Sequence, residues 1–262
     1  MLNFITWDVN PEIFSIGSIS IRYYGILFAS SFVVGYLIMR KIFLKEGLTV
    51  ELLDKLSTYG FVGTVIGARL GHVIFYEPGR YLDNPIEILQ IWKGGLASHG
   101  AGIGIAISLY LVSKKLNRSF LWTADRVAMI VAIAGFFIRM GNLMNSEIYG
   151  VATNMPWGFI FAYNNEIVPK HPTQLYEGGI ALLLFGFLYY GYYKTKMYSK
   201  PGLALGIFLV TIFTDRFFIE FIKQVQSVFE KNMILDMGQI LSIPAVLIGV
   251  FLVVRAYKRD SV

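Results

Sequence analysis

Apolar runs of about twenty residues recur seven times along this chain of 262 residues, and they limit its fold more than any other feature. A bilayer hydrocarbon core of about 30 Å needs roughly 20 apolar residues in each helix that crosses it. The predicted spans are Ile21–Met39, Ser57–Phe75, Leu96–Val112, Leu121–Ile138, Leu175–Tyr193, Leu203–Phe221 and Gly238–Val254. We therefore predict an all-α integral membrane protein with seven transmembrane helices.

The composition supports this class. Hydrophobic side chains make up 55% of the chain and charged ones 15%, whereas soluble proteins carry about 25% charged residues. The same figures exclude a disordered chain, because disorder requires low hydrophobicity and high charge. The chain has no cysteine, which excludes a disulfide scaffold, a cysteine nucleophile and a cysteine-ligated metal site.

The basic residues indicate the orientation of the spans. Thirteen Lys and Arg residues fall on one side of the predicted helices and seven fall on the other. Because an excess of Lys and Arg marks the cytoplasmic face, we expect the N-terminus outside and the C-terminus inside. The net charge of +6 is then explained by topology, and no nucleic-acid partner is needed.

We expect a single transmembrane domain over residues 1–262. Residues 141–174, rich in Asn, Gly, Pro and Trp, are predicted to form a small outer (periplasmic) head segment inserted between spans four and five. The first dozen residues, through Pro11, are predicted to form an amphipathic piece at the outer interface.

Several ionisable residues lie in or near the predicted spans, where a charge costs at least about 2.5–3.5 kcal/mol at mid-helix and usually has a partner and a purpose. They are Arg69, His72, His99, Asp125, Arg126, Arg139, Glu177, Asp215, Arg216 and Glu220. Their bias towards the outer ends of the helices predicts one shared site near the outer leaflet. The three histidines of the chain lack metal-ligand spacing, so no metal site is predicted.

Arg139 and Asn142 are the first candidate pair. In a helix, residues 139, 142 and 146 share a face, so a guanidinium and polar partners would point the same way. A guanidinium suits an anionic phosphodiester because its planar fork donates two parallel hydrogen bonds. The alternative is an arginine that reaches from the helix end to the interface. The spacing leaves both interpretations open.

Arg216 and Glu220 lie four residues apart, which fits either a simple intrahelical ion pair or a second phosphate-binding arginine oriented by a carboxylate. His99 stands in a glycine-rich stretch at the start of the third span. It is either a hydrogen-bonded interior group or a general base, since histidine titrates near neutral pH. Both pairs of alternatives remain open at this point.

Taken together, short motifs spread along nearly the whole chain resemble, in the same order, those of the prolipoprotein diacylglyceryl transferase family. They are FSIG at 14–17, RYYG at 22–25, SHG at 98–100, RMGNLMNSEIYG at 139–150, HPTQLYE at 171–177, RFFIEF at 216–221 and MGQILSIP at 237–244. Three positions differ from many members. Ala101 and Gly102 stand where a Gly-Leu pair is common, and Ile212 stands where a tyrosine is common.

The resemblance implies an enzyme of lipoprotein biosynthesis in the bacterial cytoplasmic (inner) membrane, with its active site towards the outer leaflet. Such an enzyme transfers the diacylglyceryl group of phosphatidylglycerol to the lipobox cysteine of a preprolipoprotein signal peptide. The products are a thioether and glycerol phosphate, and the family uses no metal or organic cofactor.

The resemblance also implies roles by position. Arg139 and Arg216 match arginines that hold the phosphatidylglycerol head group, and His99 matches the proposed base. The other matching substrate-binding positions are Tyr24, Asn142, Asn145, Glu147, Gly150 and Glu220.

The rival hypothesis is a secondary transporter or channel for a small anion, because intramembrane charges also mark ion paths. The absence of an inverted repeat in the sequence argues against it. A scaffold or receptor without chemistry would explain the spans but would leave the charges in them without a purpose.

Overall fold

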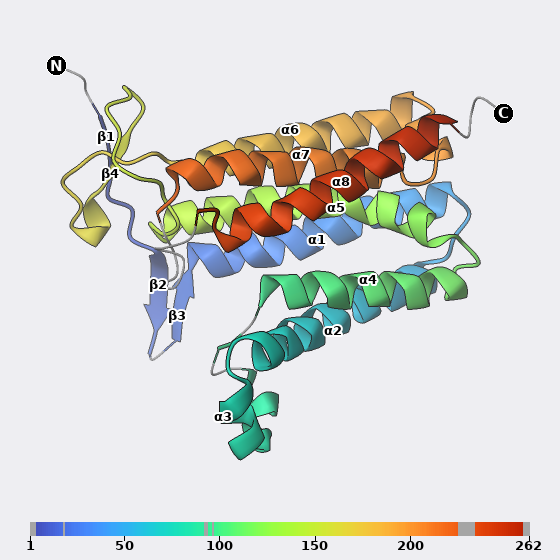
Figure 1. The fold of residues 1–262 in the computed structure, drawn as a ribbon, viewed down its shortest axis with the longest axis horizontal. Coiled ribbons are helices and arrows are strands. Elements are labelled where there is room, and N and C mark those ends of the chain that lie inside the picture. The colour runs from blue at the N-terminus through green and yellow to red at the C-terminus, as the bar shows by residue number, and fades with distance from the viewer. Residues whose placement is uncertain (1–3, 18, 92–93, 96, 225–233, 259–262) are drawn as a thin grey trace. The chain divides into compact units, whose positions relative to one another are not determined.

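The computed structural model describes residues 4–17, 19–91, 94–95, 97–224 and 234–258, without the side chains of residues 16, 19, 98 and 99. It is mostly helical (Figure 1). A long helix covers each predicted apolar segment, with ends that differ from the prediction by a few residues. These helices are α1 (Tyr23–Lys45), α2 (Val50–Phe75), α4 (Ser98–Lys115), α5 (Phe120–Met144), α6 (Thr173–Lys194), α7 (Leu203–Ile219) and α8 (Met237–Lys258).

Among the described residues, the helices α1, α5 and α8 are long and apolar enough to cross a membrane. Large apolar side chains are exposed on α1 and α8. Val33 on α1 is 58% exposed, and Leu247 and Phe251 on α8 are 65% and 64% exposed. Contact of such surfaces with water costs free energy, whereas contact with lipid chains does not. The helices are therefore those of a membrane protein.

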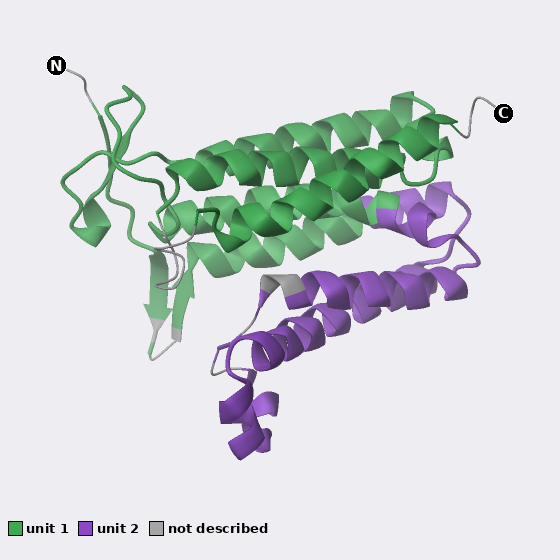
Figure 2. Cartoon of the chain, viewed as in Figure 1, with its two compact units in different colours: residues 1–37, 125–262 green, residues 38–124 purple. Residues whose placement is uncertain are grey.

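The chain forms two compact units, shown in different colours in Figure 2. The first comprises residues 1–37 and 125–262, and the second comprises residues 38–124. The backbones of α1 and α5 continue from one unit into the other, because each unit boundary falls inside one of these helices.

In the first unit, successive helices run in alternating directions (Figure 1). The ends of α5 and α7 therefore lie with the beginnings of α6 and α8 at one end of the bundle, where the strands also lie. The helices α7 and α8 approach closely at two glycines, since a Cβ atom on Gly206 would lie 2.8 Å from the carbonyl oxygen of Gly249. Short 3-10 turns flank α7: η4 (Met197–Ser199) before it and η5 (Glu220–Ile222) after it.

Two small sheets lie at that end of the first unit. Strand β1 (Ile5–Trp7) pairs in parallel with β4 (Phe159–Phe161), and β2 (Glu12–Ile16) pairs antiparallel with β3 (Ile19–Arg22). The predicted amphipathic piece at the N-terminus is thus partly a strand. Its partner lies about 150 residues away in the sequence, so the local pattern could not indicate the pairing.

The segment between α5 and α6 is mostly irregular. Residues 141–144 of the predicted head segment still belong to α5 and residues 173–174 already belong to α6, while the part between contains β4 and the short turn η3 (Ala162–Asn164). A small core holds it together: Phe161 and Phe159 are buried beside Leu143, and Trp7 packs against them. The indole nitrogen of Trp7 also donates to the carbonyl oxygen of Leu143 at 3.1 Å. The N-terminal strand and the end of α5 therefore support this segment.

The second unit is built on α2 and α4, joined through α3 (Pro78–Asp83) and η1 (Pro85–Leu89). Glycines let the two long helices approach almost backbone to backbone. A Cβ atom on Gly71 would lie 2.7 Å from the Cα atom of Gly100, and one on Gly67 would lie 2.9 Å from the Cα atom of Gly104. Small residues at such contacts are typical of helix pairs in membranes.

Candidate active site

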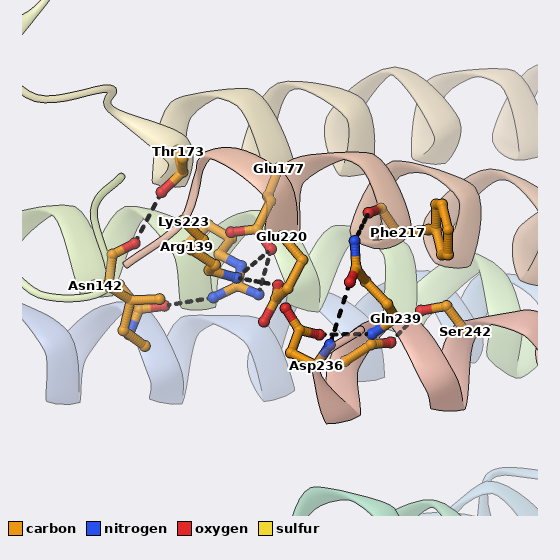
Figure 3. A network of polar contacts seen from close by, with 12 residues as sticks. Arg139, Asn142, Thr173, Glu177, Phe217, Glu220, Lys223, Asp236, Gln239 and Ser242 are labelled. Atoms are coloured by element: carbon orange, nitrogen blue, oxygen red, sulfur yellow. Dashed lines mark hydrogen bonds and ion pairs between the residues drawn. The ribbon is translucent and has the colours of Figure 1, made fainter. Parts of the chain in front are cut away.

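Arg139 lies near the end of α5 and points toward the beginning of α6 (Figure 3). Its Nη2 atom donates to Oε1 of Glu177 at 2.7 Å, and its Nη1 atom donates to Oδ1 of Asn142 at 3.4 Å. The Glu177 side chain is only 7% exposed. A buried carboxylate thus fixes the arginine from one side.

Lys223 enters the same cluster from the chain beyond η5. Its Nζ atom lies 3.0 Å from Oε1 of Glu177 and 3.5 Å from Oε2 of Glu220, and the side chain is 4% exposed. In the sequence this lysine is only one of the basic residues predicted on the outer side. Its spacing of three residues from Glu220 was the one signal that could have indicated the ion pair.

Arg216 and Glu220 occupy successive turns at the end of α7 and in η5. Glu220 pairs with Lys223, and its carboxylate lies against the start of α8, because a Cβ atom on Gly238 would come 2.9 Å from Oε1. Within the described part of the chain, the side-chain hydrogen bonds and ion pairs do not include Arg216. The simple Arg216–Glu220 ion pair is therefore absent there, and the guanidinium acts on Glu220 only through space.

Asn142 and Asn145 both turn toward Glu147. Their Nδ2 atoms donate to Oε1 of Glu147 at 2.8 Å and 3.3 Å. The backbone carbonyl of Glu147 accepts from Nε2 of Gln174, at the start of α6, at 2.7 Å. Ser146 lies beyond the end of α5 with a φ angle of +50°, so it does not continue the helical face that Arg139 and Asn142 share.

Gly150 has a steric reason to be glycine. A Cβ atom there would lie 2.5 Å from the carbonyl oxygen of Ile222 and 2.7 Å from Cβ of His171. Gly150 also forms an antiparallel bridge with Lys223. This contact of two backbones brings the lysine to the end of α5, where its side chain meets Glu177.

Tyr24 lies in the first turn of α1 and packs against the last turns of α5. A Cβ atom on Gly141 would come 2.7 Å from Cδ2 of the Tyr24 ring. The first unit therefore gathers eight predicted site residues at one end: Tyr24, Arg139, Asn142, Asn145, Glu147, Gly150, Arg216 and Glu220.

The expectation of one shared site for all intramembrane charges is wrong for Asp125 and Arg126, which lie toward the opposite end of α5. The carboxylate of Asp125 accepts from the backbone nitrogens of Gly202 and Leu205 at 2.7 Å and 2.8 Å. It therefore satisfies amide groups at the beginning of α7 that have no partner within the helix. The guanidinium of Arg126 lies 5.5 Å from the centre of the Tyr198 ring.

Arg69 belongs to the second unit and donates hydrogen bonds to the backbone of that unit. Its guanidinium donates to the carbonyl oxygens of Ile88 at 2.8 Å, Gly94 at 2.6 Å and Gly95 at 3.0 Å.

His99 is the second residue of α4, and its side chain lies outside the described part of the structure. Its role as a base stays a prediction.

The family model for prolipoprotein diacylglyceryl transferase matches residues 11–255 of this chain. The chain belongs to that family. The transferase of Chloroherpeton thalassium named for phosphatidylglycerol and prolipoprotein is 44% identical over 258 residues, which cover 98% of this chain and 96% of the relative. The equivalent protein of Porphyromonas gingivalis is 46% identical over 273 residues, with 98% and 96% covered, and that of Rickettsia felis is 38% identical over 258 residues, with 96% and 98% covered.

The family assignment confirms the resemblance inferred from the motifs. The relatives match from one end of the chain to the other and carry the name of one transferase. Nothing in these comparisons favours a transporter or channel for a small anion.

Proposed function

We propose that this protein transfers the diacylglyceryl group of phosphatidylglycerol to the cysteine thiol of a prolipoprotein lipobox. Membership of the transferase family is the observation that carries the proposal. The cluster of Arg139, Glu177, Lys223 and Glu220 supports it, because it places one buried and one partly exposed cation at one end of the bundle, where an anionic head group would need them.

In this proposal the chain crosses the bacterial inner membrane seven times, with its N-terminus outside and its C-terminus in the cytoplasm. The alternating helix directions of the first unit and the uneven distribution of Lys and Arg support this arrangement. The end of the first unit that carries Arg139 then faces the outer leaflet, and the irregular segment at residues 145–172 lies on the outer side.

Arg139 and Arg216 hold the phosphodiester, and Tyr24, Asn142, Asn145, Glu147, Gly150 and Glu220 surround it. During transfer the phosphate gains negative charge, because a phosphodiester with one charge becomes a phosphomonoester that approaches two. Preorganised cations in a site with little water stabilise that change by several kcal/mol. Glu177 keeps Arg139 in position without occupying all of its donors.

The substrate cysteine supplies the nucleophile. Its thiol loses a proton, for which His99 is the proposed acceptor, and a positive field raises the thiolate fraction of a group whose reference pKa is about 8.5. The thiolate attacks the glycerol carbon of the diacylglyceryl group. The C–S bond forms as the C–O bond to phosphate breaks, and glycerol phosphate leaves with the electron pair. This scheme uses no metal ion and no organic cofactor.

The test uses purified protein in phosphatidylglycerol micelles with a fluorescent lipobox peptide. Mass spectrometry should show the gain of one diacylglyceryl group on the peptide cysteine. The gain should disappear in Arg139→Ala and Arg216→Ala and persist in Arg118→Ala, which removes an exposed arginine between α4 and α5. Normal turnover in either of the first two variants would refute the phosphate-binding role.

A further variant tests the role of His99 as a base independently of the phosphate site. If His99 accepts the thiol proton, His99→Gln should lower the rate most below the thiol pKa and less at higher pH, where the thiolate forms without help. A rate unchanged at every pH would remove the base from the mechanism and leave the arginines in place.

A further inference from the structure

The segment that joins α2 to α4 exposes three large apolar side chains. Leu82 in α3 is 79% exposed, and Ile86 and Leu89 in η1 are 76% and 75% exposed. Single exposed apolar residues are ordinary on protein surfaces, but three in one short segment form a patch of the kind that marks an interaction. Residues 77–90 are called the connecting segment below.

Contacts within the connecting segment and with Arg69 give it a defined conformation. Arg80 donates to Glu77 at 2.9 Å and to Glu87 at 2.8 Å, so one guanidinium ties α3 to η1. Tyr81 is buried, and the guanidinium of Arg69 lies 4.9 Å from the centre of its ring. The exposure of the three apolar residues therefore belongs to a segment with internal ion pairs and a buried anchor.

Arg69 links the connecting segment to the chain that precedes His99. It donates to the carbonyl oxygens of Glu87 and Ile88 in η1 and to those of Gly94 and Gly95. Gly95 has a φ angle of +75°, and a Cβ atom there would lie 2.7 Å from Nη1 of Arg69. One buried side chain thus sets the position of the segment and of the backbone that leads into α4.

We propose that the connecting segment inserts Leu82, Ile86 and Leu89 into the outer leaflet, at the boundary between lipid head groups and acyl chains. The inference rests on α2 being a span, as proposed above. The helix α2, which leads into the segment, also exposes large apolar side chains, with Ile66 52% exposed and Ile74 60% exposed.

The length and pattern of the connecting segment fit an interfacial position. A stretch of about 14 residues is too short to cross a bilayer and is typical of an interfacial or re-entrant piece. An element with one apolar and one charged side lies in the interface with its apolar side about 5–10 Å deep. Leu82, Ile86 and Leu89 supply exposed apolar groups, and Arg80 with its two carboxylate partners supplies charged groups.

The absence of cysteine from the chain allows a direct test of depth. Leu82→Cys, Ile86→Cys and Leu89→Cys are each labelled with an environment-sensitive fluorophore and reconstituted in vesicles of phosphatidylcholine and phosphatidylglycerol. Asp83→Cys, an exposed position in the same segment, and Ile66→Cys on α2 are the controls. Brominated lipids should quench positions 82, 86 and 89 about as strongly as position 66, while aqueous iodide should quench position 83.

The outcomes separate this proposal from the topology on which it rests. Lipid quenching at position 66 without quenching at 82, 86 and 89 overturns the insertion and leaves the span intact. Labels at these three positions that neither lipid nor iodide quenches would indicate contact with protein, which also overturns it. Loss of quenching at position 66 itself would refute α2 as a span. Diacylglyceryl transfer by each labelled variant confirms that it is folded.

Discussion

The contact between α2 and α4 offers the sharpest test of the packing. Gly67 faces α4 so closely that a Cβ atom would lie 2.9 Å from the Cα atom of Gly104, and nearer still to the carbonyl oxygen of Gly100. Ordinary contact begins at 3.4 Å, so Gly67→Ala must move α4 away by at least about half an ångström. Both neighbours are backbone atoms, and no side-chain rotation can relieve the clash.

The expected cost follows from two opposing terms. Overpacking of this kind destabilises proteins by about 1–3 kcal/mol. Alanine also favours the helix over glycine by up to about 1 kcal/mol. Gly60→Ala on the same helix is the matched control, because a Cβ atom there meets nothing within 4 Å. The helix-propensity term is common to both variants, so their difference isolates the packing cost and should be about 1–3 kcal/mol.

The assay is reversible unfolding in mixed micelles titrated with sodium dodecyl sulfate and followed by circular dichroism. Gly67→Ala should unfold at lower detergent fraction than the parent chain, and Gly60→Ala at an equal or higher fraction. The pair Gly104→Ala and Gly102→Ala repeats the comparison from α4, since a Cβ atom on Gly102 also meets nothing within 4 Å. Equal stability of Gly67→Ala and Gly60→Ala would refute the close backbone contact.

Three further perturbations test the first unit. Glu177→Gln should destabilise the fold by about 3–5 kcal/mol, because it removes the buried carboxylate that the buried Lys223 and the partly exposed Arg139 share, and should lower transfer. Gly141→Ala should displace the Tyr24 ring and reduce the transfer rate, measured with the lipobox peptide. Burial lowers the pKa of His171, so the fold favours the neutral imidazole. Its contribution to stability is complete above about pH 6.5 and is lost as pH falls through the lowered pKa. Melting temperatures between about pH 8 and pH 5 should show this loss, which His171→Gln should reduce.

Each of these three perturbations has a control. Glu12→Gln breaks an exposed pair with Arg22, which is worth at most about 1 kcal/mol, and a Glu177→Gln variant no less stable than this one would contradict the buried cluster. Gly135→Ala on α5 meets its nearest atom only at 3.5 Å, so it should leave transfer unchanged. A pH profile of melting that is identical in the parent chain and in His171→Gln would remove the histidine from the acid response.

Hydropathy alone predicted the helices, because a lipid solvent requires long apolar runs with satisfied backbones. The motif at 139–150 likewise indicated Arg139 and Asn142 as partners, because residues three apart in a helix are neighbours. The same rule failed for Arg216 and Glu220. Their spacing allows an ion pair, but Glu220 pairs with Lys223 in the structure. Local spacing gives the possible partners, and tertiary packing selects among them.

What the sequence could not indicate depends on contacts between distant segments. In the sequence, Lys223 resembles any basic residue that follows a span. Only the backbone bridge to Gly150 directs its side chain into the cluster. Asp125 was grouped with the site charges, but its partners are backbone amides about 80 residues away at Gly202 and Leu205. A carboxylate that caps a helix and one that pairs with an arginine look alike in sequence. They differ only in what the fold brings next to them.

Because Arg139 and Lys223 share Glu177, the cluster can be stable and, in the proposed function, still bind an anion. One oxygen, Oε1, accepts from Arg139 and from Lys223, so a single carboxylate holds two cations. A guanidinium has five N–H donors, and among the described residues Arg139 bonds Glu177 and Asn142 through two of its nitrogens, while its side chain keeps 22% exposure. Glu177 and Asn142 therefore fix the guanidinium, and the described part of the chain leaves further donors for an anion. In the proposed mechanism little reorganisation is then required when phosphate binds, so the guanidinium can stabilise the charge that develops as the C–O bond breaks.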